Sequence, residues 1–481
     1  MKLSQSAFLG LVAIVSTGAA NAQITIRFAA SNGDRNATQV AISKVLTNWS
    51  YQGLGGVATG LGGSGQAPSD TFRTSNFGTW NGTYDGKNVI IKTNFAGALA
   101  GIAAVANPDS VVRFDPSNGL GGTQITVNPL EATLPGDFST GKVDFGLSTN
   151  FQSTSPFSGT YENIPYNTVK EIPVGISQLG FYGSPGIPID SITTQQARLL
   201  YDTGAIPLAL ITGNWAADAK KYIYALGRNT DAGQRFSAQN EIGRDGLGSQ
   251  GAWEPTPAPS AGGAANAPLV ADPANPGQFI TNGAYDPTKS FVIGSSSPLG
   301  GIVSDHRVWN GGVPQTISGI RSTQGYNSGA NIAIALTYKL GEAAYKKVDP
   351  AATAGWYVGY ITPGDANVTV LGNGQGVQRP ADSKGVALKF NGVENTAANV
   401  KSGRYTLWLY NRIITPLDGV ADKEDPGETE GFRQNFVNSL RDQIKLEVST
   451  QQGISLTDPD LKVFRTEDGG PVIPGTLPTG D

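Results

Sequence analysis

Short apolar segments alternate along the chain with segments of helical periodicity. Ile24–Ala29 alternates and is β-branched, which predicts a strand, and the apolar positions from Val40 to Trp49 have helical spacing. Further strands are expected at Val89–Thr93, Val143–Gly146, Ile172–Tyr182, Ile223–Leu226, Trp356–Ile361 and Val386–Phe390. Helices are expected at Gly97–Val105, Thr194–Tyr201, from Asp231 onward, within Ser322–Lys347 and from Phe432 to Ile444. This order predicts an α/β protein with mostly parallel sheets and ligands at the strand ends.

Two stretches lack this periodicity. Gly53–Gln66 is rich in glycine and is expected to be a loop. Residues 251–290 are rich in Ala, Pro and Gly, and we expect them to form a surface insertion.

The first residues are typical of a secretory signal. Lys2 is followed by an apolar run, Ala7–Val15, that is too short to span a bilayer, and then by the small residues of Ala20–Ala22. We therefore expect residues 1–22 to be removed, so that the mature chain begins at Gln23 in the periplasm or outside the cell. No later stretch has the length and apolarity of a membrane helix, so the product is not expected to be membrane-embedded.

Composition excludes several classes of function. The net charge of -4 and the pI of about 5.3 argue against a nucleic-acid surface. With no cysteine and a single histidine, neither a disulfide nor a zinc site is expected, and no metal or cofactor is predicted. His306 lies beside Asp305 without a third member of a triad, and Gly325–Gly329 has Asn327 where a nucleophile would stand, so we do not expect an enzyme.

Several segments, in the right order, resemble those of the phosphate-binding component of bacterial phosphate ABC transporters. They are Gly97–Ile102, Val143–Gly146, Ile172–Val174, Ile192–Asn214, Arg228–Arg235, Tyr357–Tyr360 and Phe390–Trp408. The resemblance implies a type II periplasmic-binding-protein fold, with two α/β lobes of mixed, mostly parallel sheets joined by two crossing strands. Lobe one would comprise residues 23–176 and 406–481, and lobe two residues 177–405. It also implies a monomer that binds a phosphate-like oxyanion and delivers it to an inner-membrane ABC permease.

The Arg228 loop has the properties of an anion site in its own right. Asp231 is a suitable N-cap, and Gln234 follows at the spacing of a capping box. A helix that begins there would point its free N–H groups toward a bound anion, and the guanidinium of Arg228 suits an oxyanion. The alternative is an ordinary capped helix beside a surface arginine.

The chain departs from the family at four positions. By resemblance, Ala232 and Ala98 stand where the family has serine, Gln234 where it has threonine, and Thr149 where it has the carboxylate that accepts the proton of monohydrogen phosphate. A hydrogen bond to a charged group contributes about 1.5–3 kcal/mol, so losing two or three hydroxyl donors would weaken binding by about a thousandfold or more unless other groups compensate. The expected binding residues are Arg228, Ala232, Gly233, Gln234, Thr149, Ser148, Ala98, Asn36 and Thr38.

The placement of these residues predicts one cleft. The turn of residues 31–38, the loop at Ala98, Ser148–Thr149 and residues 228–234 all follow short strands and should meet between the lobes. We further expect Arg228 to have no competing carboxylate. Two functions fit this sequence: an oxyanion-binding protein of an importer, or a paralogue on the same fold whose eroded site serves an envelope, surface or sensing role.

Overall fold

The computed structural model describes the greater part of the chain after residue 22. The described residues are 23–54, 56–62, 75–95, 97–121, 125, 134, 136–161, 163–228, 232–246, 250–255, 269–271, 279–281, 291–293, 307–310, 313–316, 325–326, 329–337, 340, 345–371, 384–451 and 453–477. The expected signal segment and most of the expected insertion lie outside these ranges, as does much of Ser322–Lys347. Within the last of these, α7 is formed by Gly329–Ala335.

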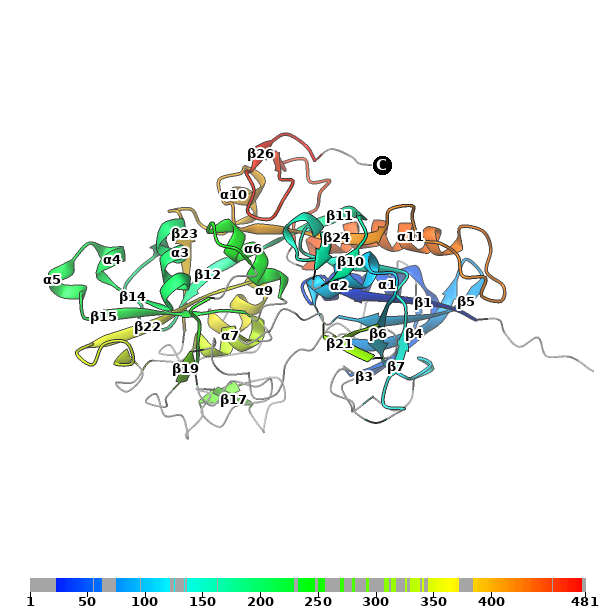
Figure 1. The fold of residues 1–481 in the computed structure, drawn as a ribbon, viewed down its shortest axis with the longest axis horizontal. Helices are drawn as coiled ribbons and strands as arrows, with labels where there is room; N and C mark the ends of the chain where they lie inside the picture. Colours follow the sequence, from blue (N-terminus) through cyan, green and yellow to red (C-terminus); the bar gives the residue numbers. More distant parts are fainter. Residues whose placement is uncertain are drawn as a thin grey trace, which may run out of the picture.

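Lobe one is built on an eight-stranded sheet (Figure 1). Its strand order is β11-β24-β8-β1-β5-β4-β2-β3. The strands are β1 Gln23–Ala30, β2 Thr47–Gly53, β3 Gly56–Gly62, β4 Phe77–Tyr84, β5 Lys87–Asn94, β8 Phe145–Ser148, β11 Val169–Gln178 and β24 Trp408–Pro416. The parallel pairs described in this sheet are β1 with β5 on one side and β1 with β8 on the other.

Helices cover both faces of this sheet. Phe28 of β1 packs in the cluster that contains α1 (Arg35–Val45) and α11 (Phe432–Glu447), whereas its neighbour Ala29 contacts Ala104 of α2 (Ala98–Ala106). Because successive side chains of a strand point to opposite faces, α1 and α11 lie on one face and α2 on the other.

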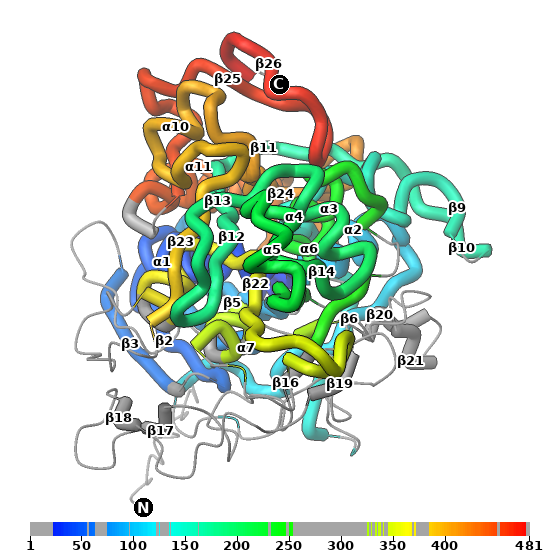
Figure 2. The backbone as a smooth tube through the Cα atoms, turned by 90° about the vertical axis from the view of Figure 1, so that its left-hand side faces the viewer, coloured from blue at the N-terminus to red at the C-terminus, as the bar shows by residue number. Residues whose placement is uncertain are grey.

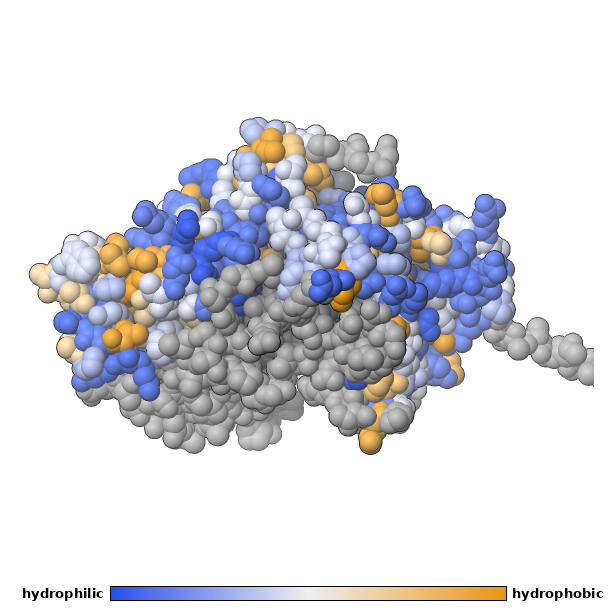
Figure 3. All heavy atoms as spheres, in the orientation of Figure 1, coloured by the Kyte–Doolittle hydropathy of each residue, from blue (hydrophilic) through white to orange (hydrophobic). Residues whose placement is uncertain are grey.

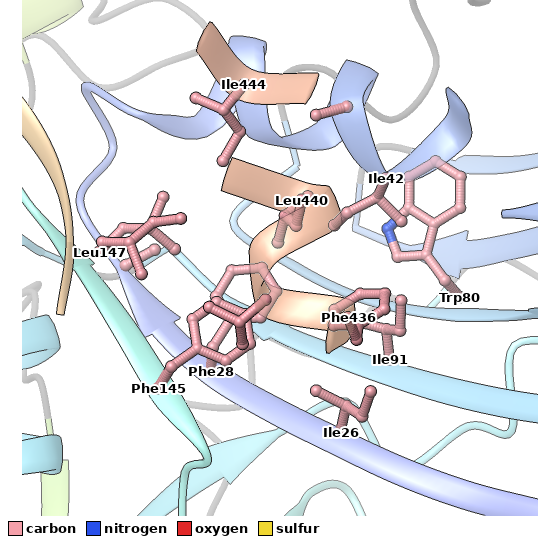
Figure 4. Packing of buried hydrophobic residues seen from close by; sticks show 14 of the residues in the cluster. Ile26, Phe28, Ile42, Trp80, Ile91, Phe145, Leu147, Phe436, Leu440 and Ile444 are labelled. Atoms are coloured by element: carbon pink, nitrogen blue, oxygen red, sulfur yellow. The ribbon is translucent and has the colours of Figure 1, made fainter. Parts of the chain in front are cut away.

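The core on the α1 and α11 face is formed by residues from distant parts of the sequence. Phe436, Leu440 and Ile444 of α11 lie on one side of the helix and meet Ile42 of α1 above the strands (Figure 4). Phe28 and Phe145 stack at 4.8 Å between ring centroids. The helical spacing of the α11 residues was visible in the sequence, and the prediction of that helix is confirmed.

Lobe two is built on a six-stranded sheet of order β13-β23-β12-β22-β15-β14. Its strands are β12 Gly180–Gly183, β13 Ser191–Ile192, β14 Ala205–Pro207, β15 Lys221–Leu226, β22 Ala354–Ile361 and β23 Val386–Phe390. Helices α3 (Thr194–Thr203) and α6 (Gly233–Glu241) contribute to one core cluster and α7 to another. The smaller helices are α4 Ala209–Thr212, α5 Trp215–Asp218, α9 Pro363–Asp365 and α10 Ala397–Lys401.

Minor sheets flank these two. β6 (Ser110–Phe114), β7 (Ser139–Gly141), β20 (Arg307–Asn310) and β21 (Val313–Thr316) form a four-stranded sheet. The two-stranded sheets are β9 (Gly159–Tyr161) with β10 (Ile164–Tyr166), β16 (Trp253–Pro255) with β19 (Phe291–Ile293), β17 (Leu269–Ala271) with β18 (Phe279–Thr281), and β25 (Val463–Phe464) with β26 (Ile473–Pro474).

Two crossing strands join the lobes, as expected. β11 continues into β12, and β24 returns from lobe two antiparallel to β11, with Ile176 opposite Tyr410. The expectation that all residues after 406 belong to lobe one differs from the packing. α11 does pack in lobe one, but the chain then crosses a third time, through a bridge between Ile454 and Ile176, and Leu456, Leu461 and Val472 pack on lobe two. This last segment lies above the lobe junction in red (Figures 1 and 2).

The prediction of a two-lobed α/β fold is confirmed, but the prediction of mostly parallel sheets is wrong. Among the twelve strand pairs of the two large sheets that the structure describes, four are parallel: β1 with β5, β1 with β8, β13 with β23 and β15 with β22. Several of the antiparallel pairs come from strands β2 to β5, which pair with one another in hairpins. β2 includes Trp49, expected in a helix, and the glycine-rich stretch expected as a loop contains β3.

Among the residues coloured by hydropathy in Figure 3, hydrophilic ones cover most of the surface. Apolar residues gather at the outer end of lobe two, where Leu199, Leu210 and Trp215 of α3 to α5 are exposed. None of the helices in the described ranges combines the length and apolarity needed to span a bilayer.

Candidate anion site at the lobe junction

The expected site segments lie at the carboxyl ends of strands in both lobes. In lobe one the turn after β1 begins at Ser31, α2 follows β5, and Thr149 follows β8. In lobe two Arg228 follows β15 by two residues. Each of these four strands has a parallel neighbour, and open α/β sheets bind ligands at that end of such strands.

Gly233 of lobe two lies directly against lobe one. A methyl group placed on its Cα would lie 2.2 Å from Oγ1 of Thr149, 2.5 Å from Oδ1 of Asn150 and 2.6 Å from Cβ of Ala98. The structure thus brings together three of the residues expected in the site, one from lobe two and two from lobe one. These contacts leave no room for a side chain at Gly233, and none for a tetrahedral anion between the same atoms.

Asn150 links the two lobes through its side chain. Its Nδ2 lies 3.3 Å from the carbonyl oxygen of Gly233, 3.3 Å from Oγ of Ser237 and 3.2 Å from Oδ2 of Asp468. Its backbone N–H donates to Oγ of Ser148 at 3.1 Å, which places the Ser148 hydroxyl beneath this loop. Asn150 was not predicted as a site residue, although it directly follows Thr149.

Helix α6 begins at this junction without a side-chain cap. Its N-cap is Ala232, which provides no side-chain cap. The prediction of a capping box is therefore wrong. The N-cap is one residue later than expected, and the side chain of Gln234 accepts from Arg228 instead. Asp231 itself lies outside the described residues. The first N–H groups of a helix have no partner within the helix and carry a partial positive charge, so they suit an anion.

Arg228 is buried, with 7% of its surface exposed, and is held by lobe two. Its Nη1 donates to Oε1 of Gln234 at 2.6 Å and its Nε to the carbonyl oxygen of Tyr326 at 3.1 Å. Its backbone N–H donates to the hydroxyl of Tyr360. The guanidinium is therefore oriented in advance, and the alternative of a surface arginine does not apply.

The expectation that Arg228 has no competing carboxylate is wrong. Asp365 of α9 interacts electrostatically with Arg228 and also with Arg35 of lobe one. Burial raises the pKa of Asp365 above its ordinary value, and the two arginines oppose that rise. Burial likewise lowers the pKa of Arg35 to about 10, against the effect of Asp365. A carboxylate that interacts with both arginines competes with any anion that binds Arg228.

The turn after β1 contributes buried polar groups but not all of the expected ones. Thr38 is fully buried and its Oγ1 has no hydrogen-bond partner, whereas Asn36 is exposed on α1. Oγ of Ser31 accepts from the N–H of Gly33 at 3.0 Å, and a methyl group on Gly33 would lie 3.3 Å from Cγ2 of Thr149. The turn therefore meets the loop after β8 through Gly33.

Two buried charged groups beside this turn were not predicted. Asp34 is 2% exposed; its Oδ1 accepts from Nδ2 of Asn411, and its Oδ2 has no hydrogen-bond partner. Burial raises the pKa of Asp34 to about 7, opposed by the Asn411 hydrogen bond and the charge of Arg412. Arg412 is fully buried over the ring of Phe151, 3.4 Å from the ring centroid, and its three guanidinium nitrogens make no hydrogen bonds.

The buried groups near this turn carry charges of both signs: Asp34 and Glu171 are acidic and Arg412 is basic. Arg412 lies 3.6 Å from a carboxylate oxygen of Glu171, and burial lowers the pKa of the arginine. Arg412 lies within the apolar strand Trp408–Pro416. Because charged residues are seldom buried without a partner, its position in the sequence could have indicated a buried polar site. In the part of the chain that the structure describes, no cluster of His, Asp or Glu has the arrangement of a metal site.

The strand order and the crossing strands define a two-lobed α/β fold with two large mixed sheets. No family model matches the chain, and no curated protein matches it.

Solved structures similar to this chain bear names of the family that the motifs resemble. An ABC-type phosphate transport receptor from Vibrio cholerae is 10% identical, with 89% of this chain and 99% of that chain covered and a TM-score of 0.39. A possible phosphate binding protein from Planctomyces limnophilus is 10% identical, covering 90% and 92%, with a TM-score of 0.34. A phosphate-binding protein from Stenotrophomonas maltophilia is 12% identical, covering 67% and 78%, with a TM-score of 0.28. At these values the fold assignment rests on the strand order given above.

Proposed function

We propose that this chain is an exported, monomeric solute-binding protein that binds phosphate or a related small oxyanion between its lobes and delivers it to an inner-membrane ABC permease. One observation carries the proposal: the start of α6, which has no side-chain cap, faces the loops after β5 and β8 of the other lobe, with Arg228 held beside it. Backbone N–H groups and one oriented guanidinium are the donors that an oxyanion requires.

Binding requires the lobes to separate first. Gly233 is in contact with Thr149 and Ala98, so the anion enters an open arrangement and the lobes then close around it. On closure it would meet the N–H groups of α6, the guanidinium of Arg228 and the hydroxyl of Thr149. Asp365 must give up part of its interaction with Arg228, which reduces the net affinity.

The proposed site should discriminate poorly between phosphate and sulfate. A carboxylate accepts the proton of a protonated oxyanion and repels one without a proton, whereas the hydroxyl of Thr149 can donate to either. Replacing Thr149 by Asp should therefore shift the preference toward phosphate.

Calorimetric titration in phosphate-free buffer tests these statements. The wild type should bind both anions, Arg228→Ala should abolish the binding of both, and Thr149→Asp should weaken sulfate more than phosphate. Arg198→Ala is the matched control, because Arg198 is exposed on α3 of the same lobe. Tight binding of phosphate alone by the wild type would contradict the role of Thr149. No binding of either anion would overturn the proposal and favour a paralogue without a transport role.

The exported location rests on residues 1–22 and is tested separately. The intact mass of the protein recovered from outside the inner membrane should correspond to a chain that begins at Gln23. A mass that includes residues 1–22 would contradict both the cleavage and the export.

A further inference from the structure

The C-terminal segment after α11 contacts both lobes, and we call residues 454–477 the C-terminal strap. It starts at the crossing strands, where the backbone of Ile454 bonds to that of Ile176 at 2.8 and 3.0 Å. It then lies on lobe two, where Lys401 of α10 pairs with Asp458 at 3.2 Å. Its third contact is with lobe one.

Arg465 fixes the strap to helix α6. Its Nη1 lies 3.0 Å from Oε2 of Glu241, at the end of α6, and both side chains are more than nine-tenths buried. Its Nη2 donates to the carbonyl oxygen of Thr406, and its guanidinium lies 4.3 Å from the centroid of a Trp408 ring. Gly469, with φ of +67°, lies so close to Asn240 that a methyl group there would be 2.3 Å from its backbone. The strap and α6 are thus one rigid surface of lobe two.

Asp468 extends from this surface to lobe one. Its Oδ2 accepts from Oγ1 of Thr154 at 2.6 Å, from the backbone N–H of Phe151 at 3.0 Å and from Nδ2 of Asn150 at 3.2 Å. These three donors belong to the loop after β8 that also carries Thr149. Only 7% of Asp468 is exposed, so these donors take the place of water around its carboxylate.

We infer that Asp468 is a positioning residue that holds Asn150 against α6 and thereby keeps the two lobes closed. The two amide hydrogens of Asn150 are divided among three acceptors, on Gly233 and Ser237 of α6 and on Asp468, so one amide is shared by lobe one, α6 and the strap. The inference rests on the proposed function for its consequence: because Gly233 is in contact with Thr149 and Ala98, an anion enters only after the lobes separate, so the strap sets how often the site opens to admit one.

The chain offers a clean way to measure this. It contains no cysteine, so Gln195→Cys on α3 and Asn435→Cys on α11, both exposed, give one spin label on each lobe. Distance distributions by pulsed electron paramagnetic resonance, without any anion, then report the fraction of open molecules. Stopped-flow association with sulfate measures admission to the site.

Asp468→Asn should raise the open-to-closed ratio at least about tenfold, the effect of losing one charge-assisted hydrogen bond, and should accelerate sulfate association by the same factor. Asn150→Ala should have a similar effect, and the double variant should be no more open than the more open single variant, because both act through one contact. Asp460→Asn is the control: it lies on the same strap, pairs with Lys401 and is 76% exposed, and it should leave the distances unchanged.

An unchanged distance distribution in a folded Asp468→Asn protein, with the circular dichroism spectrum of the wild type, would overturn the inference. Additive opening in the double variant would do the same, since it would separate Asp468 from Asn150. If wild-type protein binds neither sulfate nor phosphate, the proposed function fails while the distance measurement still decides the role of the strap.

Discussion

A methyl group added at Gly233 should force the two lobes apart. In Gly233→Ala the new Cβ would lie 2.2 Å from Oγ1 of Thr149, 2.5 Å from Oδ1 of Asn150 and 2.6 Å from Cβ of Ala98, all closer than such atoms approach in folded proteins. All three neighbours belong to lobe one, so opening relieves every contact at once. Alanine is also favoured over glycine within helices by up to about 1 kcal/mol, so α6 itself should not be weakened.

The size of the effect follows from the cost of overpacking. Inserting a methyl group into a well-packed site costs about 1–3 kcal/mol, which corresponds to a roughly 5- to 140-fold fall in the closed-to-open ratio. The assay is the distance between spin labels at positions 195 and 435, together with calorimetric titration of sulfate. Gly33→Ala is the matched control, because its methyl group would meet Thr149 only at 3.3 Å. A Gly233→Ala protein as closed as the wild type would refute the placement of α6 against lobe one.

Two further predictions concern buried charges. Asp34 carries a pKa of about 7 against an ordinary 3.8, so above pH 7 its ionised form costs the fold about 4 kcal/mol, at 1.36 kcal/mol per pKa unit. The cost is absent below about pH 4, where the carboxyl is protonated in both the folded and the unfolded chain, and grows as the pH rises to 7. Asp34→Asn should therefore raise the free energy of unfolding in urea at pH 8 but not at pH 4. The affinity of the wild type for sulfate should fall as the pH rises through 7, and in Asp34→Asn it should not. Equal gains in stability at both pH values would contradict the burial of this carboxyl. Arg433 is fully buried and pairs with Asp144 at 2.8 Å and Glu428 at 2.6 Å, so Arg433→Met should lower the free energy of unfolding by about 3–5 kcal/mol, whereas Arg441→Met, whose partner Asp442 is 62% exposed, should cost less than about 1 kcal/mol. Similar losses in the two arginine variants would contradict the burial of Arg433.

The sequence by itself determined several of the elements and their order. Helical spacing placed α11, and alternating apolar residues placed β1 and β22, because these patterns report which face of an element is buried. The ordered motifs also predicted that Ala98, Thr149 and Gly233 would meet, and the structure places them in contact.

Only the tertiary structure decided strand direction and the partners of the charged groups. Trp49 has the spacing of a helix but lies in β2, since its packing against Trp80, at 5.0 Å, comes from a strand 31 positions later. Asp365 and Asp468 gave no local signal, because each acquires its role from residues more than a hundred positions away. Periodicity along a chain records burial against neighbouring elements. It does not record which distant polar group will be buried beside another, and that is what determines the charge and the closure of this junction.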